Sequence, residues 1–285
     1  QDFRQQLDVR TRAPRMLDGG NRNTYGVFAQ GDIVLHSKLR LNGGLRYDCY
    51  SDYDPTLNPR MALLYDPWVG TTFKAIYGTA FRAPSFLEEK LAFTKPIVPE
   101  TITTYELVWE QRLSSRLRSS VAGFFNRMDD LITFDHNLDA AEAKGVELGL
   151  EGQWAGGWRG RVSYTLQKVE DRATREQLSD APNHLVKAGL SVPLYREKIF
   201  ASLDYQFTST RNTLREDLLP GVDAVGYSVL NLTLFSRELV KGLEVSASIY
   251  NVLDTRFGDP STPQHADEII WQDGRTFRVK ALYRF

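Results

Sequence analysis

The sequence predicts an all-β protein, an antiparallel transmembrane β-barrel or the C-terminal part of one, with about 13–14 strands. Three observations lead to this prediction. Apolar and polar residues alternate with a period of two along most segments, as in strands with one apolar face. Short turns alternate along the chain with longer, more polar loops, and aromatic residues gather at segment ends. Outer-membrane barrels combine short periplasmic turns, longer extracellular loops and aromatic girdles.

The final segment illustrates the alternation. Between Phe277 and Phe285 every second residue is apolar or aromatic, and most residues between them are cationic. A weaker segment, DFRQQLDVR (2–10), is the candidate for a fourteenth strand. The same period appears in LRLNGGLRYD (39–48), TTYELVWEQR (103–112), KGVELGLEGQW (144–154), IFASLDYQFT (199–208) and GLEVSASIYN (242–251).

The apolar faces are predicted to meet lipid. Soluble β-sandwiches and lipocalin-like barrels also alternate, but their apolar faces point into a packed core. Here the polar faces carry charges on nearly every strand, and the segments reach the ~9–11 residues that cross a bilayer obliquely. No blade-like unit of about 40 residues repeats, which disfavours a propeller. The aromatic residues that would form the girdles are Tyr25, Tyr47, Tyr65, Trp68, Tyr77, Trp154, Trp158, Tyr205, Tyr283 and Phe285. Representative lipid-facing residues are Leu45, Leu107, Leu148, Leu203 and Val245.

Composition excludes several classes of protein. The 285 residues contain 35 Lys+Arg against 36 Asp+Glu, and this balance argues against nucleic acid as a partner. Cys49 is the single cysteine, so no internal disulfide is possible. No apolar run approaches the ~18 residues of a spanning helix. No basic-then-apolar signal opens the chain, and we expect a processed protein or a piece of a longer one.

One loop has a helical pattern. The stretch APSFLEEKLAF (83–93) lies in the longest loop, residues 80–100, and is the candidate for a short helix. The preceding FRAP sequence ends the strand, because Pro84 removes an amide donor and favours a turn. The other longer loops are 136–141, 172–182, 209–225 and 252–268.

Seven stretches, in order, resemble the C-terminal barrel of TonB-dependent outer-membrane receptors of the siderophore and cobalamin type. They are NPRMALLYDPWVGTTFKAIYGTAFRAPSFLEE (58–89), VPETITTYELVWEQRL (98–113), NRMDDLITFD (126–135), AKGVELGLEGQW (143–154), DAPNHLVKAGLSVPL (180–194), GYSVLNLTLFS (226–236) and SIYNVLDTRFGDP (248–260).

The resemblance implies an outer-membrane receptor of a Gram-negative bacterium. Such receptors take up ferric siderophores, haem or cobalamin, and TonB energises them through a plug domain. Their barrels have about 22 strands around that plug. No plug-like sequence or first barrel portion is found in residues 1–285, so we expect a barrel domain that lacks both and meets TonB only through the absent plug. The loop 80–100 has no histidine where haem receptors carry one, which disfavours haem.

An autonomous passive channel is the alternative function. Fourteen strands would let the two end strands pair antiparallel, with Phe3–Val9 beside Phe277–Tyr283. Porins fold an acidic loop toward a basic wall, and the loop 80–100 contains Glu88 and Glu89. The inward-facing arginines would include Arg40, Arg46, Arg60, Arg112 and Arg161.

Loop charges are the candidate contacts for a small nutrient ligand, although most exposed charges on proteins are simply solvated. By resemblance, the terminal aromatic residues Tyr283 and Phe285 form the signal that the barrel assembly machinery recognises. Outer-membrane lipid is the other expected partner. The candidate ligand-binding residues are Arg82, Glu88, Glu89, Lys90, Lys95, Arg211, Arg215, Asp259 and His265.

Neither an enzyme nor a metal cofactor is predicted. Asp48, Asp52 and Asp54 offer carboxylates for calcium, but they lack the glycine and terminal glutamate of an EF-hand loop, so a tight polar turn is favoured. The four histidines have no metal-ligand spacing. No strained nucleophile turn such as G-x-S-x-G is present.

Overall fold

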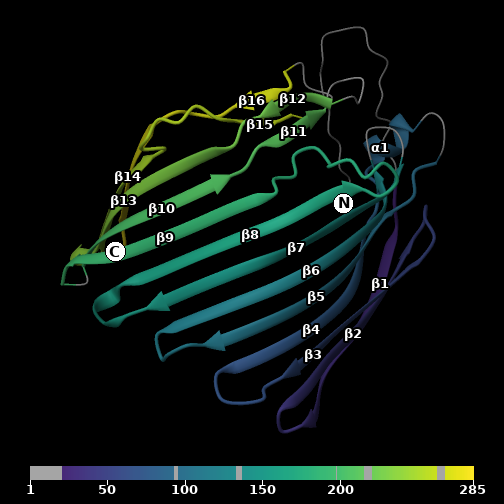
Figure 1. The fold of residues 1–285 in the computed structure, drawn as a ribbon, viewed down its shortest axis with the longest axis horizontal. Helices are drawn as coiled ribbons and strands as arrows, with labels where there is room; N and C mark the ends of the chain where they lie inside the picture. The colour runs from purple at the N-terminus through teal and green to yellow at the C-terminus, as the bar shows by residue number, and fades with distance from the viewer. Residues whose placement is uncertain (1–20, 93–95, 133–136, 197, 215–219, 262–266) are drawn as a thin grey trace. The chain divides into compact units, whose positions relative to one another are not determined.

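The computed structural model describes residues 21–92, 96–132, 137–196, 198–214, 220–261 and 267–285. Among them, 13 strands form one sheet in the order β1 to β10, β13, β14 and β17 (Figure 1). The predicted antiparallel all-β architecture and strand number are therefore confirmed. The candidate fourteenth strand, DFRQQLDVR, lies outside the described residues.

The elements alternate with turns along the whole described chain. Strands of the large sheet are β1 (Thr24–His36), β2 (Leu39–Tyr50), β3 (Thr56–Tyr65), β4 (Thr71–Arg82), β5 (Glu100–Arg112), β6 (Leu117–Ile132), β7 (Asn137–Gln153), β8 (Arg159–Asp171), β9 (His184–Tyr195), β10 (Ile199–Thr208), β13 (Tyr227–Val240), β14 (Leu243–Tyr250) and β17 (Thr276–Tyr283). Two short antiparallel ribbons lie in the loops, β11 (Arg211–Leu214) with β12 (Pro220–Ala224) and β15 (Gly258–Pro260) with β16 (Ile269–Trp271).

Two compact units are distinguishable in the chain. The first comprises the described residues of Gln1–Leu64, together with Ala75–Tyr105 and Asn126–Glu142. The second comprises the described residues of Tyr65–Lys74, Glu106–Phe125 and Ala143–Phe285. Each side-chain cluster described below lies within one unit.

Strand register in the second unit separates apolar from polar residues. Leu203 on β10 pairs with Leu190 on β9 and with Leu232 on β13. Neighbouring positions on the same strands form a polar row on the opposite face, because successive side chains of a strand alternate. A slip of one residue would exchange the two faces. The polar row consists of Ser191, Ser202, Thr233, Ser248 and Arg278.

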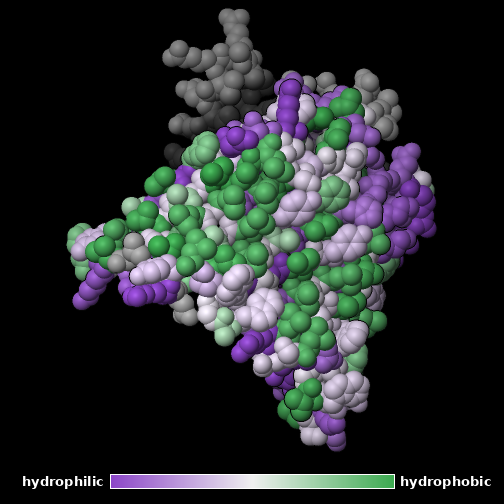
Figure 2. Space-filling view, turned by 60° about the vertical axis from the view of Figure 1, so that its left-hand side comes forward, coloured by the Kyte–Doolittle hydropathy of each residue, from purple (hydrophilic) through white to green (hydrophobic). Residues whose placement is uncertain are grey.

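The large apolar side chains are exposed rather than packed in a core. Leu107 is 68% exposed and Leu203 is 36% exposed, and Leu45, Leu148 and Val245 are exposed as well. Among the described residues, the buried hydrophobic ones are Ile97 and alanines only. Figure 2 shows hydrophobic side chains in broad patches on the side that it presents. A soluble sandwich would bury these residues, whereas a barrel wall turns them toward lipid.

The predicted helical stretch forms the short helix α1 (Phe86–Leu91). Ser85 caps it: its hydroxyl accepts a hydrogen bond from the Glu88 amide, and the Glu88 carboxylate accepts one from the Ser85 amide. This reciprocal pair satisfies two amides at the start of the helix. No helix in the described part of the chain is long and apolar enough to span a bilayer.

The Trp154 side chain lies on the apolar face of the sheet, at the short turn between β7 and β8. Atoms of its ring lie 2.5 Å from the position that a Cβ on Gly152 would occupy, and 3.4 Å from the equivalent position on Gly160. Both glycines therefore leave space for the indole. The ring lies over these two glycines of β7 and β8, where an aromatic girdle is expected.

Candidate functional site

The longer loops contain three clusters in which an arginine joins separate segments. The first, in the first unit, centres on Arg82 at the end of β4. Its Nε donates to Glu100 Oε2 at 2.6 Å, and its Nη1 donates to Glu88 Oε1 at 3.1 Å. Glu100 also accepts a hydrogen bond from the Ile132 amide at 2.7 Å. The cluster therefore links the start of α1 to strands β5 and β6.

The electrostatics of this cluster follow from its hydrogen bonds. The bond to Glu100 is the main reason that the pKa of Arg82 is raised above its ordinary value. Burial by itself would raise the pKa of Glu88, but hydrogen bonds from Ser85 and Arg82 outweigh it and hold the pKa below its ordinary value. Both groups therefore stay charged at neutral pH.

The second cluster, also in the first unit, centres on Arg22. The side chain is 15% exposed and binds two carboxylates, Asp52 at 2.6 Å and Glu89 at 2.7 Å. It also donates to the Pro84 carbonyl at 2.9 Å and to the hydroxyl of Tyr53. Arg22 thus joins the segment before β1, the β2–β3 turn and helix α1. Burial raises the pKa of Glu89 despite the Arg22 charge.

Sequence analysis missed Arg22, because nothing in the local pattern before β1 marks it. Two of the three calcium candidates nearby are engaged by arginines instead. Asp52 binds Arg22, and the fully buried Asp48 accepts two hydrogen bonds of 2.7 Å from Arg46. Among the described residues, no group of three or more His, Cys, Asp or Glu side chains is placed to hold a metal ion.

The third cluster, in the second unit, centres on Arg211 at the start of β11. This side chain is 8% exposed and binds Asp180 at 2.9 Å and Asp259 at 2.7 Å. It also donates to the Gly258 carbonyl at 3.1 Å and lies over the ring of Tyr227. Arg211 therefore ties three loops together, those that follow β8, β10 and β14.

A carboxylate supports the same loops from another side. Glu268 accepts hydrogen bonds from the Val222 amide at 2.8 Å and from the Thr213 hydroxyl at 3.3 Å. The single hydroxyl proton of Thr213 is shared with the Val222 carbonyl, which lies closer, at 2.6 Å. These bonds connect the β11–β12 ribbon to the segment before β16.

The remaining predicted loop residues differ in what the structure says of them. Lys90, in the last turn of α1, is exposed and has no ion pair or hydrogen bond within the described residues. Lys95, Arg215 and His265 lie outside the described residues. Of the predicted ligand contacts, the structure brings Arg82 together with Glu88, and Arg211 together with Asp259.

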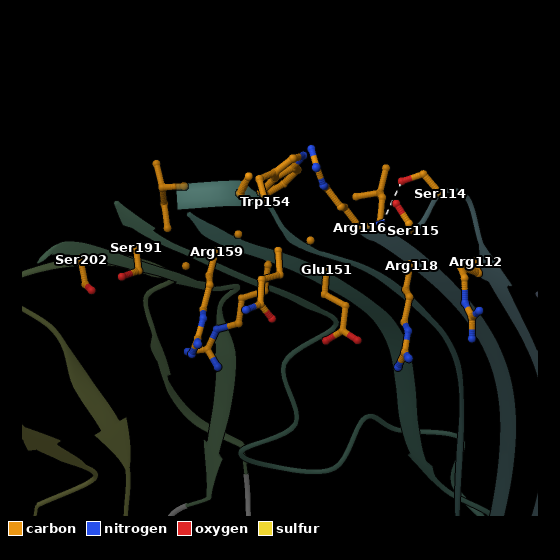
Figure 3. A pocket seen from close by; sticks show the side chains of 18 of the residues that line it. Arg112, Ser114, Ser115, Arg116, Arg118, Glu151, Trp154, Arg159, Ser191 and Ser202 are labelled. Carbon is orange, nitrogen blue, oxygen red and sulfur yellow. Dashed lines mark hydrogen bonds between the residues drawn. The ribbon is translucent and has the colours of Figure 1, made fainter. Parts of the chain in front are cut away.

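A cavity of about 1050 Å³ lies at the short-turn ends of strands β5 to β10, within the second unit. In Figure 3, Arg112, Arg118, Glu151 and Arg159 point to one side of the sheet, and Trp154 lies on the other side. The cavity side is therefore the charged and polar face, and Trp154, which also borders the cavity, has its ring on the other side of the sheet.

Two of the arginines predicted to face inward, Arg112 and Arg161, line this cavity together with Ser191 and Ser202. Arg161 forms an ion pair with Asp204 at 3.2 Å. Both residues of this pair are at least half exposed, so the pair contributes little to stability. What it shows is that the polar face continues across β8 and β10.

The predicted assembly signal lies at the end of β17. The rings of Tyr283 and Phe285 meet edge to face with centroids 5.2 Å apart. Both side chains are exposed, which leaves the aromatic pair accessible at the end of the strand. Its role in assembly stays a prediction.

An exposed apolar face on one side of an antiparallel sheet and a charged cavity on the other define the wall of a transmembrane β-barrel. Residues 2–252 match the family model "TonB dependent receptor-like, beta-barrel". The chain therefore belongs to the TonB-dependent receptor β-barrel family, as its seven sequence stretches indicated. This is a family of transport receptors.

Individual relatives share this architecture at low identity. The vitamin B12 transporter BtuB of Vibrio cholerae serotype O1 is 24% identical over 267 residues, which cover 90% of this chain and 42% of BtuB. The ferric enterobactin receptor PfeA of Pseudomonas aeruginosa, in a mutant form, superposes with a TM-score of 0.77 at 18% identity, covering 93% of this chain and 45% of that one. The copper transporter OprC superposes with a TM-score of 0.76 at 20% identity, covering 93% and 47%. This chain thus spans less than half the length of these relatives.

Proposed function

We propose that this chain forms the C-terminal part of an outer-membrane receptor that imports a ferric siderophore or cobalamin with energy from TonB. The observation that carries the proposal is the family match over residues 2–252. The names of two relatives, a vitamin B12 transporter and a ferric enterobactin receptor, support the two ligand classes.

The strand count supports completion of the barrel by further strands. In the described sheet, β1 pairs with β2 and β17 pairs with β14, and β1 and β17 stand at opposite ends of the strand order. An odd number of antiparallel strands would make these two run parallel if they closed directly on each other. An unpaired edge leaves backbone groups without partners in hydrocarbon, at several kcal/mol each. An odd number of additional strands between β1 and β17 removes both problems, and a plug on the same longer chain would supply the TonB contact.

The loop clusters divide the predicted ligand residues into two roles. Arg82 and Arg211 already bind two carboxylates each, so their charges serve to hold the loops in position. Lys90 is exposed at the end of α1 and keeps its donors for a ligand. We therefore expect Lys90 to contact an anionic group of the nutrient, with Arg82 acting as a positioning residue. Lys95, Arg215 and His265 remain proposed contacts.

The test uses the full-length receptor in cells that lack their own copy. Uptake of radiolabelled cobalamin and of a ferric siderophore is measured with and without functional TonB. We expect saturable uptake of one of the two, lost without TonB. Lys90→Ala should weaken binding of that ligand about fivefold, as expected for one charged contact of ~1 kcal/mol. Lys198→Ala, in a short turn, is the matched control. Uptake that is unsaturable and independent of TonB would instead support the passive channel.

A further inference from the structure

Two lysines and one buried carboxylate form a cluster on the apolar face of β7 and β8. Lys168 Nζ lies 2.8 Å from Glu170 Oε1, and Lys144 Nζ lies 3.6 Å from Glu170 Oε2. The Glu170 side chain is only 7% exposed, whereas those of Lys144 and Lys168 are 53% and 54% exposed. The carboxylate therefore holds two ammonium groups close together at the surface. The cluster carries one excess positive charge.

Strand alternation places this cluster on the lipid side of the wall. Arg159 at the start of β8 points into the cavity (Figure 3), so the even-numbered positions of β8 point the other way. Gly160 lies under the Trp154 ring on that side, and Leu166, 44% exposed, directly precedes Lys168 on the same face. On β7, the exposed Val146 lies two positions from Lys144, on the same face and nearer to the short turn.

The height of the cluster can be estimated from strand geometry. Gly160 and Lys168 are eight residues apart, or about 26 Å along the strand at ~3.3 Å per residue. With a barrel tilt of ~40°, this is about 20 Å along the membrane normal, within a lipid-facing band of ~25 Å. A lysine side chain then reaches past the edge of the band with its ammonium group. The cluster lies toward the longer loops, which are extracellular in such barrels.

We propose that Lys144 and Lys168 bind a phosphate group of an anionic glycolipid in the outer leaflet, with Glu170 as the positioning residue. Each ammonium has three N–H donors. Lys168 lies 2.8 Å from Glu170 and Lys144 lies 3.6 Å from it, which leaves donors on both lysines to converge on one phosphate. A lipid phosphate is the expected source, because its acyl chains would lie on the apolar stripe below, along Val146 and Leu166. Free phosphate would lack that apolar contact.

The experiment measures lipid carried by the full-length receptor. The protein is purified in detergent, incubated with lipid A that bears two phosphates, and analysed by native mass spectrometry. Dephosphorylated lipid A and inorganic phosphate serve as the other probes. Lys144→Ala and Lys168→Ala should each weaken lipid A binding about fivefold, from ~1 kcal/mol per lysine near an anionic lipid surface. The double variant should lose most of the bound lipid.

Matched controls separate this site from general charge and from misfolding. Lys187→Ala removes the same charge from β9 on the opposite, cavity-facing side. Lys187 lies two and four positions before the cavity-lining Gly189 and Ser191, so its side chain shares their face. This variant should keep normal binding. Glu170→Gln keeps the shape but removes the charge that holds the two ammonium groups together, so it should weaken lipid A binding. Heat-modifiable migration on gels checks that each variant is folded. Equal lipid retention in the double variant and in Lys187→Ala would overturn the proposal. So would equal binding of phosphorylated and dephosphorylated lipid A, or displacement of the lipid by millimolar inorganic phosphate.

Discussion

Arg211 and Asp259 form an ion pair of 2.7 Å between residues that are 48 positions apart in the chain. Asp180, 31 positions before Arg211, binds the same guanidinium at 2.9 Å. One buried side chain thus determines how three loops of the second unit meet. The cost of burying the guanidinium is offset by these two carboxylates and by the Gly258 carbonyl.

The first prediction concerns this junction. Arg211→Ala removes every one of these bonds, and the two aspartates then return to water, since both are already 40% or more exposed. We expect local opening of β11, β12 and β15 to become easier by roughly 2 kcal/mol, the scale of lost hydrogen bonds to a charged group. Hydrogen exchange of the backbone amides of residues 211–214, 258 and 259 measures it. Arg196→Ala, in the β9–β10 turn, is the control. Equal exchange rates in both variants would show that Arg211 does not hold the three loops together.

The second prediction tests membrane orientation with adjacent residues of β10. Leu203→Arg puts a charge into the apolar row, whereas Ser202→Arg puts the same charge into the polar row. We expect Leu203→Arg to lower the free energy of unfolding in lipid vesicles by about 2–4 kcal/mol, if Leu203 is near the midplane, and Ser202→Arg to lower it much less. Urea titration of the folded receptor in vesicles gives both values. Equal losses at the two positions would refute the assigned faces.

The third prediction concerns the pH response of helix α1. The folded-state pKa of Glu88 is held below its ordinary value of 4.5. Its contribution to stability is therefore complete above that value and is lost as pH falls through the lower, folded-state pKa. Hydrogen exchange of residues 88–92, corrected for intrinsic rates, should show protection falling across this acid range.

The two neighbouring glutamates should respond in opposite ways. Glu88→Gln should lower the hydrogen-exchange protection of residues 88–92 about fivefold at neutral pH, for a cap worth ~1 kcal/mol. It should also abolish the fall in protection at acid pH that comes from protonation of Glu88. Glu89 has a raised pKa, so its ionised form is the disfavoured one and protonation favours the folded loop. In Glu89→Gln this offsetting gain is absent, so the protection should fall more steeply with decreasing pH than in the wild type. Identical pH profiles for wild type and Glu88→Gln would exclude the capping carboxylate as its source.

The fourth prediction couples Trp154 to Gly152. A side chain at position 152 would meet the indole ring at 2.5 Å, so Gly152→Val forces the ring off the sheet. We expect a loss of about 1–3 kcal/mol from this overpacking. The same substitution in a Trp154→Ala background should cost much less, and unfolding free energies of the four proteins give the coupling. Strictly additive losses would show that the ring does not lie over Gly152.

The fifth prediction concerns the last residue. Deleting Phe285 removes half of the edge-to-face pair with Tyr283 at the end of β17. We expect the full-length protein to reach the outer membrane in lower amounts, while the assembled fraction unfolds at nearly the wild-type denaturant concentration. Surface labelling and urea titration measure the two quantities. Normal surface levels would argue against an assembly signal.

The sequence by itself determined the strands and their two faces. A period of two is a local property, since neighbouring side chains of a strand must point in opposite directions whatever surrounds them. Leu203 and Ser202 could therefore be assigned to opposite faces from their order alone. The helix α1 was equally local, because its cap and its first turn lie within the four residues from Ser85 to Glu88.

The tertiary structure decided which charges pair. Arg82 and Arg211 look alike in the sequence as loop arginines, and Arg22 has no local signal at all. Their carboxylate partners come from segments up to 67 positions away. A side chain a few ångströms from its partner gains several times more electrostatic energy when water is excluded, so burial decides which pairs matter. Burial is created only when the loops meet, and alternation along a strand carries no information about that meeting.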